Sequence, residues 1–439
     1  MTASAMPHRY GAQFRTQFRT QFRARFRAPF LVTASLVGAV MLTGACGEST
    51  APSPNAPVDS LLALPRALTA TERAGIASGN QFALSLLKQV APVTSKNVLL
   101  SPLSVWTALG MTMNGAAGTT EAEMQRTLGW TGRTRAESNV AYRDLSALLP
   151  SLDAAVKVKI GNAIWVRAPL VADTGFARDV RTYFSADVKS AASPQAMYDA
   201  VNAWGNQQTD GMVPKVLETP PPSDLLMLLA NAVLFDGPWR HAFDAKNTAP
   251  ARFRLESTGT DITVPTMQRM GGYRSYDESG FFAIELPYGN TAYSMLVMVP
   301  KSGTVNALVT RVDSAQLARI TSSLREASST SPLALPKFTV RGSLELSPSL
   351  RLMGMPRAFT DQAEFPRFLG IGAKLAFVQH AVTVEVNERG TRAAAVTAVG
   401  VVPVSAPVGH SVDRPFAFFI RERFAGTILF AGVVRDPRA

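Results

Sequence analysis

The sequence is poor in the residues that build disulfides and metal centres. It contains one cysteine, Cys46, so no disulfide can form within the chain. Its four histidines lie far apart and show no metal-ligand spacing, so we expect no metal site. A Gly-x-Ser-x-Gly nucleophile elbow, a Gly-x-x-x-x-Gly-Lys phosphate loop and a dinucleotide-binding fingerprint are also missing. These absences argue against the common hydrolase, NTPase and dehydrogenase classes, and we expect no cofactor.

The charge is low for a chain of 439 residues and is unevenly placed. Charged residues make up 17% of the sequence and hydrophobic residues 46%, which indicates a folded protein and not a disordered one. The formal net charge is +12, but six of the arginines fall within the first 30 residues. The remainder carries about +6 over some 400 residues, which does not call for a nucleic-acid partner.

The first 66 residues have the composition of an export signal followed by a tether. A Phe-Arg near-repeat is followed by an uncharged apolar run from Phe30 to Ala45, too short to predict a membrane span. We predict an export signal over residues 1–45; the alternative is a basic helix lying on a membrane surface. The sequence Leu42-Thr43-Gly44-Ala45-Cys46 resembles a bacterial lipobox, although Thr43 replaces the usual leucine, so Cys46 is a candidate lipid anchor. Residues 46–66 are rich in Pro and Ser, as tethers are.

The remaining residues, 67–439, mix helical and strand patterns without a break in composition. Helical spacing marks 71–87, alternation marks a strand at 156–166, and the apolar run 225–235 predicts a strand covered on both faces. Residues 253–300 are rich in strand patterns. Thr119 or Thr120 could cap a following helix, with Glu123 completing a capping box.

A stretch near the C-terminus differs from the rest of the chain in its pattern and composition. Val382, Val384 and Val386 alternate with polar residues, as in a strand, and Gly390 interrupts the pattern. From Ala393 to Val412 there is no Asp, Glu, Lys or Arg. Two prolines, at 403 and 407, disfavour the alternative of another buried strand pair. We interpret the stretch as a strand that leaves its sheet and continues as a long apolar loop.

Several motifs in this order resemble one protein family. The sequence around Gly390 resembles the reactive-loop hinge of the serpins, and Arg414-Pro415-Phe416 with 428–434 resembles their C-terminal signature. The short strand, Ser-Pro-x-Ser turn and Gly-x-x-Gly-Thr-Thr turn within 97–120 match the family in the same order. The hinge residues are Glu388, Arg389, Gly390, Thr391, Arg392, Ala393, Ala394 and Ala395.

The resemblance, which covers about residues 70–437, implies an α+β multi-sheet serpin fold. Such a fold has a large central, mainly antiparallel sheet, further β-sheets, about eight to nine helices and an exposed reactive-centre loop, here about 388–412. It places Trp239 at the top of the central sheet. It also assigns Ser101, Ser104, Asn231 and His380 to the shutter, the polar cluster where the sheet parts. A Ser-His catalytic set among these four residues is the enzyme alternative.

The resemblance further implies a suicide-type inhibitor of serine proteases. The protease cleaves the loop, an acyl-enzyme forms, and the freed loop inserts into the central sheet. Family spacing places the reactive bond at Val404–Ser405, which suits elastase-like or subtilisin-like proteases. The face formed by Thr391, Ala393, Ala395, Thr397, Val399 and Val401 is small or β-branched, as inward positions require.

Other readings and partners follow from the same features. Arg389 and Arg392 depart from the family, where acidic residues are common, but neither should block insertion. The alternative function is that of a non-inhibitory serpin-fold binding protein. As partners we expect a serine protease in a covalent acyl-enzyme complex and a membrane reached through Cys46, with no nucleic acid. We expect an exported monomer, either a cell-envelope lipoprotein or a secreted, extracellular protein.

Overall fold

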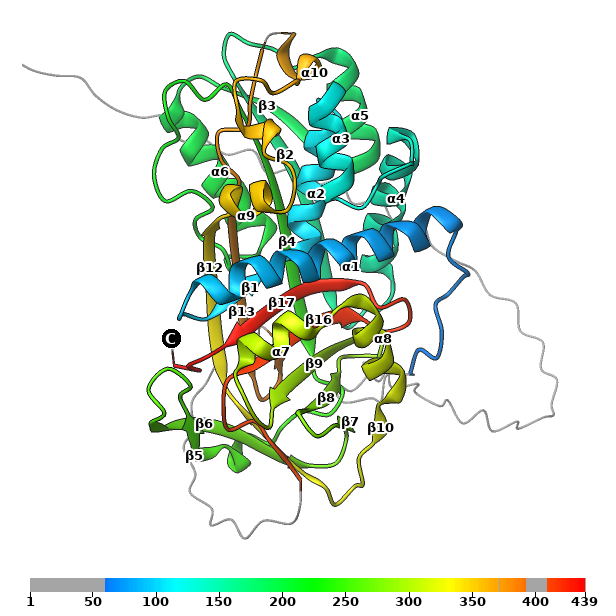
Figure 1. Ribbon diagram of the computed structural model, residues 1–439, viewed down its shortest axis with the longest axis vertical. Helices are drawn as coiled ribbons and strands as arrows, with labels where there is room; N and C mark the ends of the chain where they lie inside the picture. Colours follow the sequence, from blue (N-terminus) through cyan, green and yellow to red (C-terminus); the bar gives the residue numbers. More distant parts are fainter. Residues whose placement is uncertain (1–59, 371, 392–408, 439) are drawn as a thin grey trace, which may run out of the picture. The chain divides into compact units, whose positions relative to one another are not determined.

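The computed structural model describes residues 60–370, 372–391 and 409–438. Within these residues there are three sheets, and the helices lie mainly in the upper and middle parts of the view in Figure 1. Most of the large side chains of the described fold, including those of the central strands, join one extended hydrophobic core.

The six-stranded sheet carries the stretch singled out in the sequence. All its neighbouring strands are antiparallel except β2 and β3, which are parallel and are joined by the crossover helix α5. In order across the sheet the strands are β12 (Phe338–Glu345), β13 (Gln379–Asn387), β14 (Gly390–Thr391), β4 (Met227–Pro238), β2 (Lys157–Arg167) and β3 (Asp187–Ala191).

The other two sheets have seven and four strands, and most of their strands lie in the lower half of the view in Figure 1. The seven-stranded sheet is antiparallel throughout and contains β1 (Val98–Leu100), β17 (Ile428–Val434), β16 (Phe416–Glu422), β9 (Tyr293–Pro300), β8 (Phe281–Pro287), β7 (Arg274–Asp277) and β10 (Arg325–Glu326). The four-stranded sheet contains β15 (His410–Ser411), β11 (Pro332–Pro336), β6 (Asp261–Met270) and β5 (Ala249–Arg254).

Ten α-helices lie in the described residues, against an expectation of eight to nine, and two of them are short. The helix α9 has six residues and α10 has four. The helices are α1 (Ala70–Val90), α2 (Pro102–Met113), α3 (Gly118–Thr127), α4 (Arg135–Leu148), α5 (Thr174–Phe184), α6 (Pro194–Gln208), α7 (Val305–Arg311), α8 (Ser314–Ser323), α9 (Ser347–Leu352) and α10 (Pro366–Leu369). Short 3₁₀ turns follow at Ala91–Val93, Leu149–Ser151, Ala245–Asn247 and Arg357–Phe359.

The patterns that predicted β2, β4 and α1 are confirmed, and the structure gives the reason for the apolar run in β4. One face of β4 packs in the main core through Val233 and Phe235. The other face packs with Trp204 of α6 in a second cluster that includes Ala230 and Ala232. A strand covered on both faces needs apolar residues at nearly every position, which explains the absence of alternation.

The predicted capping box at the start of α3 is wrong. The helix begins at Gly118, and the backbone N–H of Thr120 donates to Oε2 of Glu364 at 3.1 Å. In return the hydroxyl of Thr120 accepts from the backbone N–H of Glu364 at 3.0 Å. A carboxylate from a distant segment therefore fills the role that we assigned to Glu123, whose side chain accepts from the backbone N–H of Arg357 instead.

Candidate functional site

The two residues of β14 lie between β13 and β4 and join them. Thr391 pairs with Val386 on one side and with Gly237 on the other, and Gly390 pairs with Asn387 and Pro238. Position 390 requires glycine because a Cβ there would lie 2.2 Å from the carbonyl oxygen of Gly237. The predicted hinge glycine thus allows the chain to enter the sheet against the backbone of β4.

The hinge is fixed by charged and polar contacts at Glu388. Its Oε1 accepts from the hydroxyl of Thr248 at 2.8 Å and lies 3.0 Å from Nζ of Lys337. Burial opposes ionisation of this carboxyl, but the hydrogen bonds and the Lys337 ammonium outweigh it, so its pKa lies below the ordinary value. The sequence analysis named Glu388 but missed Thr248 and Lys337, because both come from distant segments.

An aromatic pair supports the same region from the core side. The rings of Trp239 and Tyr288 are stacked with centroids 4.4 Å apart, and Trp239 Nε1 donates to the carbonyl of Asn387 at 2.8 Å. The hydroxyl of the buried Tyr288 is hydrogen-bonded to that of Thr391. Trp239, which directly follows the last residue of β4, therefore lies beside the hinge, and Tyr288 is a contact that the sequence analysis missed.

The four predicted shutter residues gather around β4 and β13. His380 is buried, and Nε2 of its ring accepts from the backbone N–H of Ser101 at 2.9 Å. Burial lowers the pKa of His380 to about 4, so the ring is neutral at pH 7. The Ser104 hydroxyl is 3.4 Å from the Asn231 carbonyl. Asn231 Nδ2 donates to Oδ1 of Asn162, a partner that was not predicted, at 2.6 Å.

This geometry argues against the enzyme alternative. A nucleophilic serine needs its hydroxyl hydrogen-bonded to the histidine. The Ser101 hydroxyl instead donates to the carbonyl of Leu429 at 3.0 Å, and Nε2 of His380 accepts from the backbone N–H of Ser101. Within the described ranges, no group of three or more His, Cys, Asp or Glu side chains could hold a metal ion.

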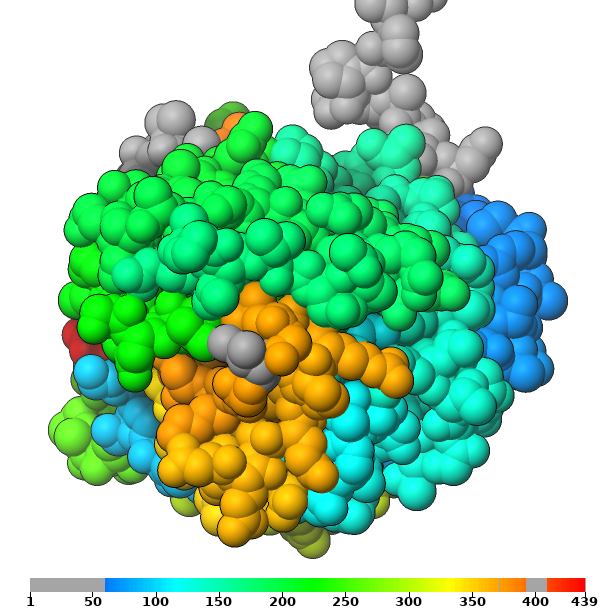
Figure 2. Space-filling model, turned by 90° about the horizontal axis from the view of Figure 1, so that it is seen from above, coloured from blue at the N-terminus to red at the C-terminus, as the bar shows by residue number. Residues whose placement is uncertain are grey.

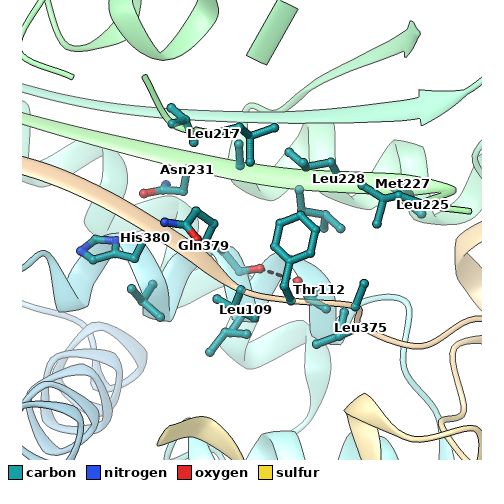
Figure 3. Close-up of a pocket in the computed structure, with 18 of the residues that line it drawn as sticks. Leu109, Thr112, Leu217, Leu225, Met227, Leu228, Asn231, Leu375, Gln379 and His380 are labelled. Carbon is teal, nitrogen blue, oxygen red and sulfur yellow. Dashed lines mark hydrogen bonds between the residues drawn. The ribbon is translucent and has the colours of Figure 1, made fainter. Parts of the chain in front are cut away.

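A gap opens between β13 and β4 beyond the two residues of β14. Among the described residues no strand pairing joins β13 directly to β4. We call this gap, bounded by residues 379–385 of β13 and 227–236 of β4, the slot. A cavity of about 510 Å³ occupies its far end, and Figure 3 shows the side chains that surround it. They include Leu109, Thr112, Leu217, Leu225, Met227, Leu228, Asn231, Leu375, Gln379 and His380.

The segment that precedes β13 closes the far end of the cavity. Residues between Thr360 and Val378 contribute to its lining. Seen from that end, this part of the chain, coloured orange, lies at the surface between the cyan and green parts (Figure 2). The slot is therefore bounded by two strand edges, those of β13 and β4, that no pairing among the described residues joins directly. Such edges can accept a further strand.

Part of the predicted site lies outside the described residues. Arg392 and the three alanines that follow it, the reactive-bond residues Val404 and Ser405, and Cys46 all fall there. Glu388, Arg389, Gly390 and Thr391 are the hinge residues that the structure describes.

Comparison with known proteins agrees with this architecture. Iripin-2 of Ixodes ricinus is 32% identical, and the match covers 81% of this chain and 92% of the relative. The corticosteroid-binding globulin of Saimiri sciureus is 27% identical over 81% of this chain and 89% of its own length. The native structure of the thermophilic serpin tengpin superposes with a TM-score of 0.75 at 26% identity, covering 86% of this chain and 97% of that one. The family model for serpins, described as serine protease inhibitors, matches residues 77–437, and the chain therefore belongs to the serpin family.

Proposed function

We propose that this serpin inhibits serine proteases by loop cleavage and insertion. The observation that carries the proposal is the slot, which begins directly beyond Gly390 and Thr391, the two residues that already pair with both β13 and β4. The reactive-centre loop of about 388–412 begins at that point. A strand that continued from Thr391 into the slot would pair with both free edges.

The register of β14 specifies where each later residue would go. Thr391 faces Val386, and the buried positions of β13 alternate from there through Val384 and Val382 to His380. Continued in the same register, Ala393 and Ala395 come opposite Val384 and Val382, on the core side. Small side chains fit at these positions because the core below is already packed.

The same register brings Thr397 to the level of the shutter. It would lie opposite His380 in β13 and opposite Asn231 in β4. Oδ1 of Asn231 is buried and has no hydrogen-bond partner among the described residues. The Thr397 hydroxyl could supply that hydrogen bond, so insertion would satisfy a group that is costly to leave unpaired.

Arg392, which departs from the family pattern, also finds suitable neighbours. On the outer face it would lie between Glu385 of β13 and Asp236 of β4. Asp236 already interacts with other groups, and Lys157 of β2 is its partner in register. An arginine between two carboxylates is nevertheless favourable, which explains how this chain tolerates a cation at that position.

Chemically, the protease serine attacks the carbonyl carbon of the residue before the cleaved bond. An ester forms and the amine of the next residue leaves. We place this bond at Val404–Ser405, fourteen positions after Gly390. A small branched residue after Pro403 suits the narrow pocket of elastase-like or subtilisin-like enzymes. Mass spectrometry of the cleaved protein tests this placement, and a cut outside 402–406 would reject it.

The decisive experiment mixes the protein with elastase and examines the products by denaturing electrophoresis. Inhibition by this route gives an SDS-resistant band of summed mass. Cleavage without such a band favours the alternative, a non-inhibitory serpin-fold binding protein. That alternative is kept because corticosteroid-binding globulin, one of the relatives, is named for a ligand.

We also propose an export signal at 1–45, a tether at 46–66, a serpin domain at 67–439 and a lipid anchor at Cys46. The apolar run before Cys46 and the Pro- and Ser-rich residues after it support this layout. None of the helices in the described ranges has the length and apolarity to cross a membrane. We expect a monomer, outside the cytoplasm. Cys46→Ser should release the protein from the membrane fraction of the expressing cells, and unchanged membrane association would reject the anchor.

A further inference from the structure

A groove lies between helix α5 and the edge strand β3, in the upper part of the view in Figure 1, where both are labelled. Its volume is about 420 Å³, within the range of pockets that hold small organic ligands. The end of β2 and the segment that joins β2 to α5 complete its lining. None of its lining residues also lines the cavity of the slot, so the groove is a separate feature of the fold.

The floor of the groove is apolar. Val166 of β2 and Ala177 of α5 are buried, and Val188 of β3 is partly buried against the main core. Val171, in the segment between β2 and α5, also lines the groove and is 78% exposed. A lone exposed valine is ordinary, but here it stands beside further apolar surface. A ligand with an apolar body would remove both from water, which is favourable.

The pleat of the sheet decides which side chains of β3 reach the groove. Ser190 pairs with Val166, whose side chain packs in the main core on the α5 side, so the Ser190 hydroxyl lies on that side as well. Lys189 pairs with Trp165, which packs in the second cluster on the opposite face. The Lys189 Nζ lies 5.9 Å from the centroid of the Trp165 ring. Lys189 therefore lines the groove with its backbone, and its ammonium group belongs to the other face.

Arg181 supplies the positive charge at the groove. Thr174, Ala177 and Arg181 follow one another at helical spacing along one face of α5, and seven residues of helix rise about 10 Å. Arg181 is exposed and has no ion pair or hydrogen bond within the described ranges, and no Asp or Glu lines the groove there. Arg178 on the same helix is instead paired with Asp179 at 2.9 Å. The guanidinium of Arg181 is thus available to an anion.

We propose that this groove binds a medium-chain carboxylate, with the carboxylate on Arg181 and the hydrocarbon chain along Val166 and Ala177. One cation at the end of an apolar floor suits a ligand with one negative charge and an apolar body. A guanidinium can hold a carboxylate through two parallel hydrogen bonds. The volume equals roughly fourteen water molecules, which leaves room for a chain of about ten carbons.

The test is a calorimetric titration of the protein with decanoate, below the concentration at which decanoate forms micelles. Decanol has the same chain without the charge, and acetate has the charge without the chain. Arg181→Ala removes the cation, Arg181→Lys keeps it, and Thr174→Trp fills the opposite end of the groove. Arg178→Ala is the matched control, because it makes the same change on the same helix outside the groove. A melting curve without ligand shows that each variant is folded.

We expect decanoate to bind the wild type and Arg178→Ala equally. Arg181→Ala should weaken binding roughly tenfold, which corresponds to about 1.4 kcal/mol, because the charge-assisted hydrogen bonds are lost. Arg181→Lys should lose less, since it keeps a point charge but not the paired geometry. Thr174→Trp should also weaken binding, because its ring occupies space that the chain needs. Decanol should bind more weakly than decanoate and with the same affinity to Arg181→Ala, and acetate should not bind.

Other outcomes overturn the proposal. The absence of decanoate binding to the wild type would reject it. Equal affinity in the wild type, Arg181→Ala and Thr174→Trp would place the ligand elsewhere, and decanol binding as tightly as decanoate would remove Arg181 from recognition. If Thr174→Trp fails to fold, the two alanine variants decide the question. Because the groove is separate from the slot, decanoate should bind intact and loop-cleaved protein alike, and this result does not depend on whether the protein inhibits a protease.

Discussion

Cleavage of the loop should raise the melting temperature of this protein. The perturbation is a single cut at about Val404–Ser405, made with a catalytic amount of protease. In the register of β14, residues 392–401 would then bring ten further backbone N–H groups into the slot. At roughly 1 kcal/mol net for each hydrogen bond donated, they stabilise the cut form by about 10 kcal/mol.

This free energy translates into a temperature that a melting experiment resolves easily. For about 360 residues the unfolding entropy is roughly 0.8 kcal/mol per kelvin, so 10 kcal/mol corresponds to a rise of about 13 °C. Apolar burial in the slot adds to this figure. Circular dichroism or calorimetry of intact and cut protein, freed of the protease, measures it.

A matched variant separates insertion from other effects of cleavage. Ala395→Arg places a charge on the core side, opposite Val382, where burying it is costly. This variant should be cut at the same bond, form no SDS-resistant complex and gain much less on melting. If the cut wild type melts no higher than the intact protein, the reasoning from the slot is wrong.

Three further predictions concern charged and titratable groups. Arg392→Glu should slow complex formation about tenfold, because the new carboxylate would face Glu385 and Asp236. Adding Asp236→Lys to that variant should restore most of the rate. Equal rates in the wild type, the single variant and the double variant would show that these carboxylates do not act on Arg392. Because the folded pKa of Glu388 is lowered, its contribution to stability is present above the unfolded pKa and lost as pH falls through the folded value. The difference in melting temperature between the wild type and Glu388→Gln should therefore become smaller as the pH falls. A difference that stays constant with pH would contradict this prediction. His380 has a folded pKa of about 4, so below pH 6.5 it must release its proton on folding, and the free energy of unfolding should fall by roughly 3 kcal/mol between pH 6.5 and pH 4. Urea titrations measure this change, and His380→Gln should lose it. The same pH dependence in His380→Gln would show that another group causes it.

The sequence predicted those elements whose pattern is local. Alternation in β2, the apolar run in β4 and the helical spacing of α1 each depend on neighbours in the chain, and each prediction is confirmed. The cap of α3 failed because Glu364, more than 240 residues away, provides the carboxylate. A local motif cannot indicate that a distant side chain competes for the same N–H group.

The residues of the candidate site also differ in whether a local pattern in the sequence could predict them. Gly390 and the small residues after it stand out in the sequence, since a strand entering a sheet requires them. Lys337 and Tyr288, which hold Glu388 and Thr391, give no comparable signal. Lys337 lies between β11 and β12, a position that has meaning only once the two sheets are assembled. A buried tyrosine and a lone lysine are ordinary residues until the fold brings them to the hinge.

The two residues of β14 have a kinetic consequence. Beginning a strand is the slow part of its formation, because several dihedral angles are fixed before many bonds form. Here Thr391 is already paired on both sides, so under the proposed mechanism only propagation would remain after cleavage. Strand pairing on this scale proceeds in microseconds. Hydrolysis of the acyl-enzyme would then compete with a fast insertion step. Whether the complex is trapped or hydrolysed would depend on how quickly the attached protease can be pulled along, and not on a search for the first contact.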